Sequence, residues 1–204
     1  MSDGIIDQSK DATPIDDLSG LLQDITTRQE LNDAEALNIV NATDWIDNGR
    51  IDDPFTATFY RTLHTKMYDE VWAWAGELRS QTGEVTHPGS RPEDVGRDIA
   101  RVAMDFHREW EALNDHDHLL PLIARYHHQL VLVHPFNNGN GRWSRLAADA
   151  VLQRLANQPP LTWATDTLVV DSAERKAYIA ALKKADNGDI APLFDYLRVS
   201  NPER

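Results

Sequence analysis

The chain has 204 residues, of which 41% are hydrophobic and 26% charged, a balance typical of a folded globular domain. Its formal net charge of -13 repels nucleic acids and anionic membranes, so neither is an expected partner. The lack of cysteine excludes disulfides and thiolate metal sites. No leader-like start or membrane-length apolar run is visible, so the cytoplasm is the expected location.

The N-terminal part of the sequence predicts a short arm followed by a helix. Residues 1–24 are polar with scattered aliphatic side chains, which is typical of an extension that lies over a domain. Thr27 and Glu30 have the spacing of a capping box, and the helical periodicity that follows them continues to Trp45. We therefore expect an arm over 1–24 and one domain over 25–204.

A second helix is expected from Pro54, because apolar residues recur every three or four positions from there to Trp74. Gly76 ends this pattern. The turn-rich segment 76–90 has no helical period and predicts a small hairpin or loop.

The rest of the chain predicts helices. Ser90 with Pro92 and Glu93 resembles a capped start, which opens a helix ending near Trp110. Further helices are expected over residues 119–133, 140–155, 171–184 and 191–199. Every strong signal is helical, so the expected fold class is all-α with the small hairpin as its β element.

The residues between two of these helices can form an anion site. His134 ends an apolar helix that Pro135 closes, and Phe136 can be buried to fix the loop. The small and amide residues from Asn137 to Gly141 can turn their main-chain N–H groups inward. A helix begins directly after them, and its positive end adds to the same concave spot, so a phosphate is the natural occupant.

Arg142 and Arg145 lie three residues apart and so share one face of that helix, where they can hold successive phosphates. His134 at the rim can take a proton from an incoming hydroxyl, although a helix C-terminus favours its charged form. An ordinary turn with solvated arginines is the alternative, and a lone Gly-Asn-Gly would favour it. The whole string together indicates phosphoryl-type transfer.

The string from His134 to Arg145 resembles the Fic motif, His-Pro-Phe-x-acid-Gly-Asn-Gly-Arg-x-x-Arg, at all but one specified position. Residues 63–79 are similar to the segment that precedes the family's target-docking flap, which would place the flap at about 78–90. The resemblance covers roughly residues 30–160, and Gln158-Pro159-Pro160 with the preceding helix is similar to the subgroup called mobile mystery protein B.

This resemblance implies a Fic-type helical bundle with a small β-hairpin flap and further C-terminal helices. It also implies a nucleotidyltransferase that moves AMP from ATP, with Mg²⁺, to a Ser, Thr or Tyr hydroxyl of a target protein. His134 would be the general base and Phe136 the loop anchor. The residues expected at the nucleotide phosphates are Asn137, Gly139, Asn140, Gly141, Arg142 and Arg145, and those expected to dock the target are Val85 and Thr86, of which Val85 fits a half-buried strand position equally well.

The sequence departs from the motif at Asn138, where the family carries an acid that holds magnesium. An amide oxygen can bind the ion but brings no charge. Three interpretations stay open: an active enzyme that tolerates the amide, a transferase with another nucleotide or phosphodiester donor, or a nucleotide-binding module with impaired catalysis.

Control is the last expectation. Many Fic proteins are silenced by a helix carrying Ser/Thr-x-x-x-Glu-Gly/Asn, whose glutamate pairs with the second arginine. Thr26 and Glu30 have that spacing, but Leu31 fills the last position and the capping box explains the same glutamate. A separate, antitoxin-like inhibitory protein that reaches Arg145 is therefore expected.

Overall fold

The computed structural model describes residues 18–49, 51–82, 88–113, 119–163 and 172–202. Its elements are α1 (Arg28–Asn48), α2 (Ala57–Tyr68), α3 (Arg79–Thr82), the 3-10 helix η1 (Pro92–Asp94), α4 (Val95–Glu111), α5 (Leu119–Val133), α6 (Asn140–Leu155), α7 (Ala173–Ala185) and α8 (Ala191–Ser200). Within these ranges β pairing is limited to two isolated bridges, Leu21 with Trp72 and Leu78 with Phe136. The expected all-α fold is confirmed.

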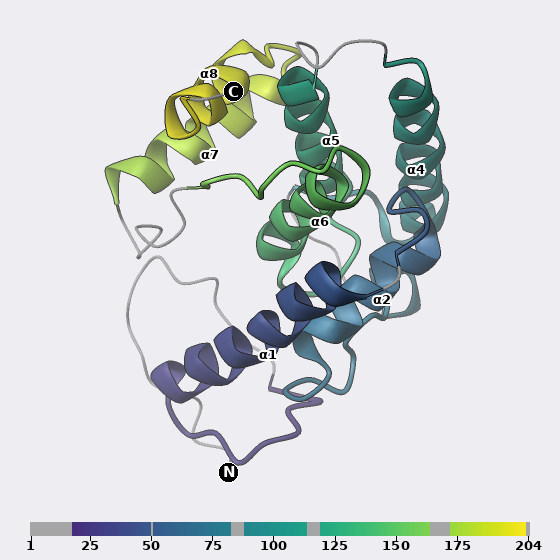
Figure 1. The fold of residues 1–204 in the computed structure, drawn as a ribbon. Coiled ribbons are helices and arrows are strands. Elements are labelled where there is room, and N and C mark those ends of the chain that lie inside the picture. Colours follow the sequence, from purple (N-terminus) through teal and green to yellow (C-terminus); the bar gives the residue numbers. More distant parts are fainter. Residues whose placement is uncertain (1–17, 50, 83–87, 114–118, 164–171, 203–204) are drawn as a thin grey trace.

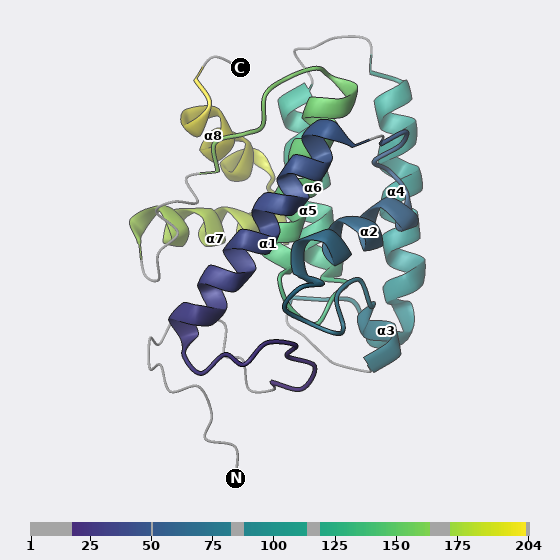
Figure 2. The same cartoon turned by 60° about the horizontal axis from the view of Figure 1, so that its bottom comes forward.

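The helices surround α5 and α6, which lie at the centre of the molecule (Figure 1). Helices α2 and α4 lie on one side of this pair, α7 and α8 lie on the other, and α1 crosses over α2 and α6 (Figure 2). One apolar core joins these elements, and a smaller cluster formed by Tyr178, Ala181, Leu182 and Leu193 fills the space between α7 and α8. None of the described helices has both the length and the apolarity to cross a bilayer.

Helix α1 begins with the capping box that the sequence predicts. The Thr27 hydroxyl accepts from the Glu30 N–H at 3.2 Å, and the Glu30 carboxylate accepts from the Thr27 N–H at 3.0 Å. The same carboxylate accepts from the N–H and the hydroxyl of Thr26. One oxygen of the Glu30 carboxylate, Oε2, is therefore engaged in starting the helix.

Helix α2 ends at Tyr68, so the expectation that it continues to Trp74 is wrong. The apolar residues beyond it are buried by a different arrangement. The described part of the N-terminal arm lies beside them, where the Leu22 N–H donates to the Val71 carbonyl at 2.9 Å. The indole N–H of buried Trp72 donates to a carboxylate on α1. Apolar periodicity alone could not distinguish a buried turn from another helical turn.

The capped start expected at Ser90 is also wrong. The Ser90 hydroxyl donates to Asp98 at 2.7 Å instead of accepting an N–H from the helix. The chain enters α4 through η1, whose N-cap residue is Arg91, and the N-cap residue of α4 itself is Asp94. Asp98 lies within the first turn of α4, so the serine still fixes this end of the helix, but through a side-chain acceptor.

The expected β-hairpin over about 78–90 is not seen in the described parts of that segment, 78–82 and 88–90. Residues 79–82 form the short helix α3, while Val85 and Thr86 lie outside the described residues. Both flanks of the segment are bonded to the chain at the end of α5: the Arg79 N–H donates to Pro135 at 2.8 Å, and the Ser90 N–H donates to Val133 at 3.1 Å. The Arg79 side chain also donates to the Ser90 carbonyl at 2.9 Å, so the two flanks are joined to each other as well as to the chain at the end of α5.

Candidate active site

The chain reverses sharply after α5, and a buried arginine holds the reversal. His134 has a φ of 50°, a left-handed conformation that is uncommon outside glycine. The Arg79 guanidinium donates from Nε to the His134 carbonyl at 2.6 Å and from Nη2 to the carbonyls of Val133 at 3.2 Å and Ser90 at 2.9 Å. Because Arg79 has no solvent-exposed surface, these carbonyls compensate the loss of its hydration.

A neutral histidine from α2 supports the next part of the loop. The His64 Nδ1 accepts from the Gly76 N–H at 2.9 Å, and its Nε2 lies 3.1 Å from the Asn138 carbonyl. A carbonyl can only accept, so the proton is on Nε2. Burial lowers the pKa of His64 to about 3, which keeps the ring neutral, and the ring stacks on Phe136 with centroids 3.7 Å apart.

The side chain of Asn140 is used within the loop. Its Oδ1 accepts from the Phe136 N–H at 2.9 Å, and its Nδ2 donates to the Phe136 carbonyl at 2.7 Å. Both residues are buried, and Trp143 packs edge-on against the phenylalanine. The amide group of Asn140 therefore fixes the loop, and only its main-chain N–H is left to meet a ligand.

The start of α6 presents free main-chain donors. Gly139 occupies the N-cap position with a φ of 74°, and its carbonyl accepts the first helical bond, from the Trp143 N–H at 2.9 Å. The N–H groups of Asn140, Gly141 and Arg142 thus have no acceptor within the helix. Together with the helix dipole they favour an anion at this point.

The two motif arginines have different neighbours. The Arg142 Nη1 lies 2.7 Å from the Glu35 carboxylate of α1, which also accepts the Trp72 indole N–H at 2.8 Å. Burial alone would lower the pKa of Arg142, but the nearby Tyr68 and Glu35 raise it overall, so the guanidinium stays charged. Both guanidinium groups lie over a tyrosine ring: the Arg142 guanidinium carbon is 5.3 Å from the Tyr68 centroid and that of Arg145 is 6.0 Å from the Tyr178 centroid. Only Arg142 is also paired with a carboxylate among the described residues.

His134 is neutral near pH 7. Burial, assisted by the positive charge of Arg79, lowers its pKa to about 4, and the opposing effect of the Val131 carbonyl is smaller. Desolvation therefore outweighs the tendency of the α5 C-terminus to favour the charged form. A neutral imidazole, unlike an imidazolium, can accept a proton from a hydroxyl.

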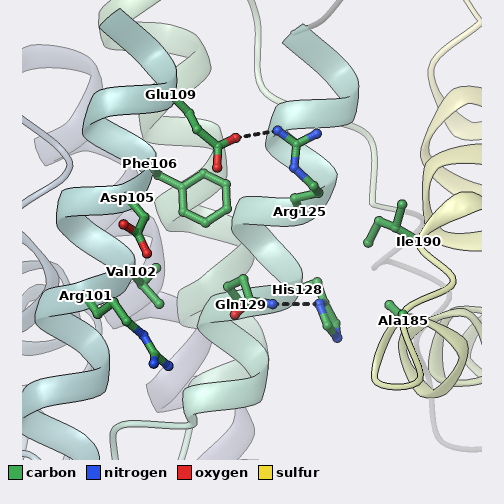
Figure 3. Close-up of a pocket in the computed structure, with 11 residues that line it drawn as sticks. Arg101, Val102, Asp105, Phe106, Glu109, Arg125, His128, Gln129, Ala185 and Ile190 are labelled. Carbon is green, nitrogen blue, oxygen red and sulfur yellow. Dashed lines mark hydrogen bonds and ion pairs between the residues drawn. The ribbon is translucent and has the colours of Figure 1, made fainter. Parts of the chain in front are cut away.

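A separate hollow of about 370 Å³ lies between α4, α5 and the turn that joins α7 to α8 (Figure 3). The ion pair of Arg125 with Glu109 spans one side of it, and Gln129 bonds to His128 at the other. It contains none of the residues between His134 and Arg145. The hollow is therefore distinct from the candidate active site.

Comparison with known proteins identifies the domain. Residues 54–152 match the model of the Fic/DOC family. This segment is a domain of that family. Two relatives called "Protein adenylyltransferase Fic" are similar to this chain. That of Nematostella vectensis is 32% identical over 126 residues, which cover 60% of this chain and 26% of the relative. That of Drosophila melanogaster is 34% identical over 124 residues, which cover 60% of this chain and 23% of the relative. The chain thus spans about a quarter of the length of these curated relatives.

The fold of the Fic domain also matches solved structures. The BepC protein of Bartonella tribocorum, determined with bound AMPPNP, superposes with a TM-score of 0.68 at 15% identity, covering 86% of this chain and 88% of that one. At this identity the likeness shows a shared fold only. The coverage of 86% extends beyond the matched segment 54–152, so it includes residues outside the Fic motif region.

The structure adds residues that the sequence reasoning left unassigned. His64 and Arg79 lie in the segment that resembles other Fic proteins, but the sequence gave them no role. Glu35 gave no signal because it is one of several acidic residues on α1. The histidine pair on α5 is structural: His127 lies 2.7 Å from the Tyr178 hydroxyl and His128 lies 2.9 Å from Asp186.

A glycine substitution tests whether the loop is as tightly packed as these contacts indicate. A Cβ at Gly139 would lie 2.5 Å from the Tyr68 ring and hydroxyl, in addition to the strain of a φ of 74°. Gly188 provides a matched control, because it has a φ of 88° but nothing within 4 Å of an added Cβ. We expect Gly188→Ala to cost about 1 kcal/mol of unfolding free energy and Gly139→Ala roughly 3 kcal/mol or more.

Denaturant unfolding of both variants measures this difference. Equal losses would mean that Tyr68 moves aside freely. A Tyr68→Leu change should recover part of the Gly139→Ala loss, because it removes the clashing atoms and leaves only the backbone strain.

Proposed function

We propose that this Fic domain transfers AMP from ATP to a Ser, Thr or Tyr hydroxyl of a target protein. The observation that carries the proposal is the continuous segment from His134 to Arg145, which places a neutral base before a helix start with free N–H donors and two arginines. Supporting it, the relatives of Nematostella and Drosophila are adenylyltransferases by name.

In the proposed reaction His134 takes the proton of the target hydroxyl while that oxygen attacks the α-phosphorus of ATP. A new phosphorus–oxygen bond forms, the bond to the β-phosphate breaks, and pyrophosphate leaves with the electron pair. The N–H groups of Asn140 and Gly141 would hold the α-phosphate, and Arg142 and Arg145 would stabilise the charge on the departing phosphates. Asn137 is assigned to the same phosphate-binding surface.

The target would approach along the segment 78–90, where Val85 and Thr86 are proposed to contact it. The support is positional, because Arg79 and Ser90, near the two ends of the segment, are both bonded to the chain next to His134. A target peptide bound there would reach the base directly. The cytoplasm, where ATP is abundant, remains the proposed location.

A His134→Ala variant tests the transfer itself. It should reduce transfer at least about 100-fold while leaving AMPPNP affinity nearly unchanged, because the imidazole acts on the hydroxyl and not on the phosphates. In the wild type, kcat should stay constant from pH 7 to pH 5 and fall towards pH 4, since only protonation below the lowered pKa removes the base.

Mass spectrometry of covalently bound AMP, on the chain or on an added protein, measures the activity. Circular dichroism at each pH serves as the control for unfolding. Wild-type turnover in His134→Ala, or an acidic limb near the ordinary histidine pKa of 6.5, would contradict the role of this residue.

Magnesium is proposed to enter with the nucleotide. Bound there, it would neutralise phosphate charge, but the protein offers it little. The Asn138 Oδ1 already accepts from the Gly139 N–H at 2.7 Å, and no group of three or more potential metal ligands occurs among the described residues. Most of the metal's ligands would then come from phosphates and water.

An Asn138→Asp variant tests this assignment. One carboxylate oxygen can keep the bond to Gly139 while the other offers a charged ligand, so magnesium should bind more tightly and transfer should be preserved or raised. A magnesium titration of AMPPNP affinity measures the effect, with Asn137→Asp as a control that adds the same charge one residue away. Identical magnesium dependence in wild type and Asn138→Asp would show that this side chain does not face the ion.

A separate inhibitory protein, antitoxin-like in its action, is proposed as a partner. The support is that Glu30 is engaged in the cap of α1, and that no ion pair joins Arg145 to a carboxylate in the part of the chain that the structure describes. We therefore propose that the inhibitory glutamate is supplied by another chain.

The variant Glu30→Gly tests for a built-in inhibitor. It should lower thermal stability through the lost cap without raising modification activity. Thr27→Ala, which removes the other half of the same cap, is the matched control. A marked gain of activity or toxicity in Glu30→Gly alone would show that the inhibitor is part of this chain.

A further inference from the structure

The C-terminal helices contribute to the surroundings of the second motif arginine. Helices α7 and α8 lie outside the segment 54–152 that matches the Fic/DOC family, and they lie beside α5 on the side away from α4 (Figures 1 and 2). From α7, Tyr178 presents its ring to the guanidinium of Arg145 at 6.0 Å from the centroid. This contact connects an element outside the family segment to the motif helix α6.

Tyr178 is itself held in place. Its side chain is buried, its hydroxyl lies 2.7 Å from the His127 Nε2 on α5, and its ring centroid lies 5.7 Å from that of Tyr196 on α8. Burial lowers the pKa of His127 to about 3, so the histidine is neutral and its contact with the hydroxyl is uncharged. The ring therefore cannot move without breaking contacts to two other helices.

Trp163 and Asp149 in turn hold the ring of His127 in place. Its ring lies 4.6 Å from that of Trp163, whose indole N–H donates to both carboxylate oxygens of Asp149, at 3.0 and 2.9 Å. Asp149 is on α6, one turn beyond Arg145 on the same helix. Arg145 lies on α6, and the contacts that support Tyr178 also lead back to α6 through Asp149.

An aromatic ring and a carboxylate hold an arginine in different ways. A carboxylate takes up N–H donors and offsets the charge, as Glu35 does for Arg142. A ring face attracts the cation through its electron density and leaves the in-plane N–H donors available. The Tyr178 hydroxyl also bonds to the Arg145 guanidinium. Neither contact carries a negative charge, so Arg145 is restrained but keeps its charge for an anion.

We propose that Tyr178 is a positioning residue that holds Arg145 ready for the terminal phosphates of the nucleotide donor. This rests on the proposed function, in which Arg145 contacts those phosphates. The consequence is that α7 sets the preference of the site for a triphosphate over a monophosphate. Arg142 contributes less to that preference, because the Glu35 carboxylate offsets its charge.

Binding of two probes to the full chain tests the proposal. In Tyr178→Leu, AMPPNP affinity should fall roughly threefold to thirtyfold, whereas AMP affinity should stay the same, because only the terminal phosphates reach Arg145. Tyr178→Phe keeps the ring but removes the hydroxyl that bonds to Arg145, so it should lose less AMPPNP affinity than Tyr178→Leu. Ile179→Ala, a change of the neighbouring and partly exposed residue of α7, is the control for general loosening of that helix.

A double-variant cycle separates positioning from mere structural support. Once Arg145→Ala has removed the guanidinium, Tyr178→Leu should cause no further loss of AMPPNP affinity. Additive losses, or equal weakening of AMP and AMPPNP, would overturn the proposal, as would a wild type that binds neither probe. A wild type that binds AMPPNP but transfers no AMP would refute the proposed function while leaving the role of Tyr178 intact.

Discussion

The candidate site depends on satisfying the main-chain polar groups of a loop that is partly buried. A turn that leaves helical geometry inside an all-α protein loses its regular hydrogen-bond partners, and each unpaired buried group is costly. Here the Arg79 guanidinium donates to the His134 carbonyl, and the His64 ring donates to the Asn138 carbonyl. The Asn140 side chain bonds to both the N–H and the carbonyl of Phe136. Three side chains from separate elements thus replace the missing secondary structure. The free N–H groups at the start of α6 are then the part of the loop left open for a ligand.

The two motif arginines differ in whether a carboxylate offsets their charge, which matters for the proposed binding of an anion. Arg142 is joined to a buried carboxylate that also holds the Trp72 indole, so its position is fixed at the expense of part of its charge. Arg145 rests on the face of Tyr178 and has no ion pair within the described residues, so its charge is not offset. The overall negative charge of the protein makes this more important, because the surrounding field opposes an anionic ligand and local cations must overcome it.

Local sequence signals predicted the parts of the fold that local interactions determine. The cap of α1 and the bounds of α5 and α6 follow from side chains within a few residues of each boundary, and they agree with the structure. The end of α2 and the role of Ser90 could not be predicted in this way, because the arm at Leu22 and the acceptor Asp98 determine them. The site followed the same rule. The motif lies in one continuous string, whereas Glu35, Arg79 and Tyr178 reach it only through tertiary contacts.

Burial of the loop and its supports has a further consequence, for pH. His64, His127 and His134 have folded pKa values of about 3, 3 and 4, all below the ordinary value of 6.5. Their neutral burial therefore contributes stability that is fully present above pH 6.5 and is lost as the pH falls from there to about 4 for His134 and about 3 for His64 and His127. Acidification therefore weakens the contacts of His64 with the loop, the contact of His127 with Tyr178 and the proposed action of His134 as a base. The neutrality of these rings suits both the proposed chemistry and the fold. Burial leaves His134 neutral, as a general base requires, and leaves His64 neutral and bonded to the loop.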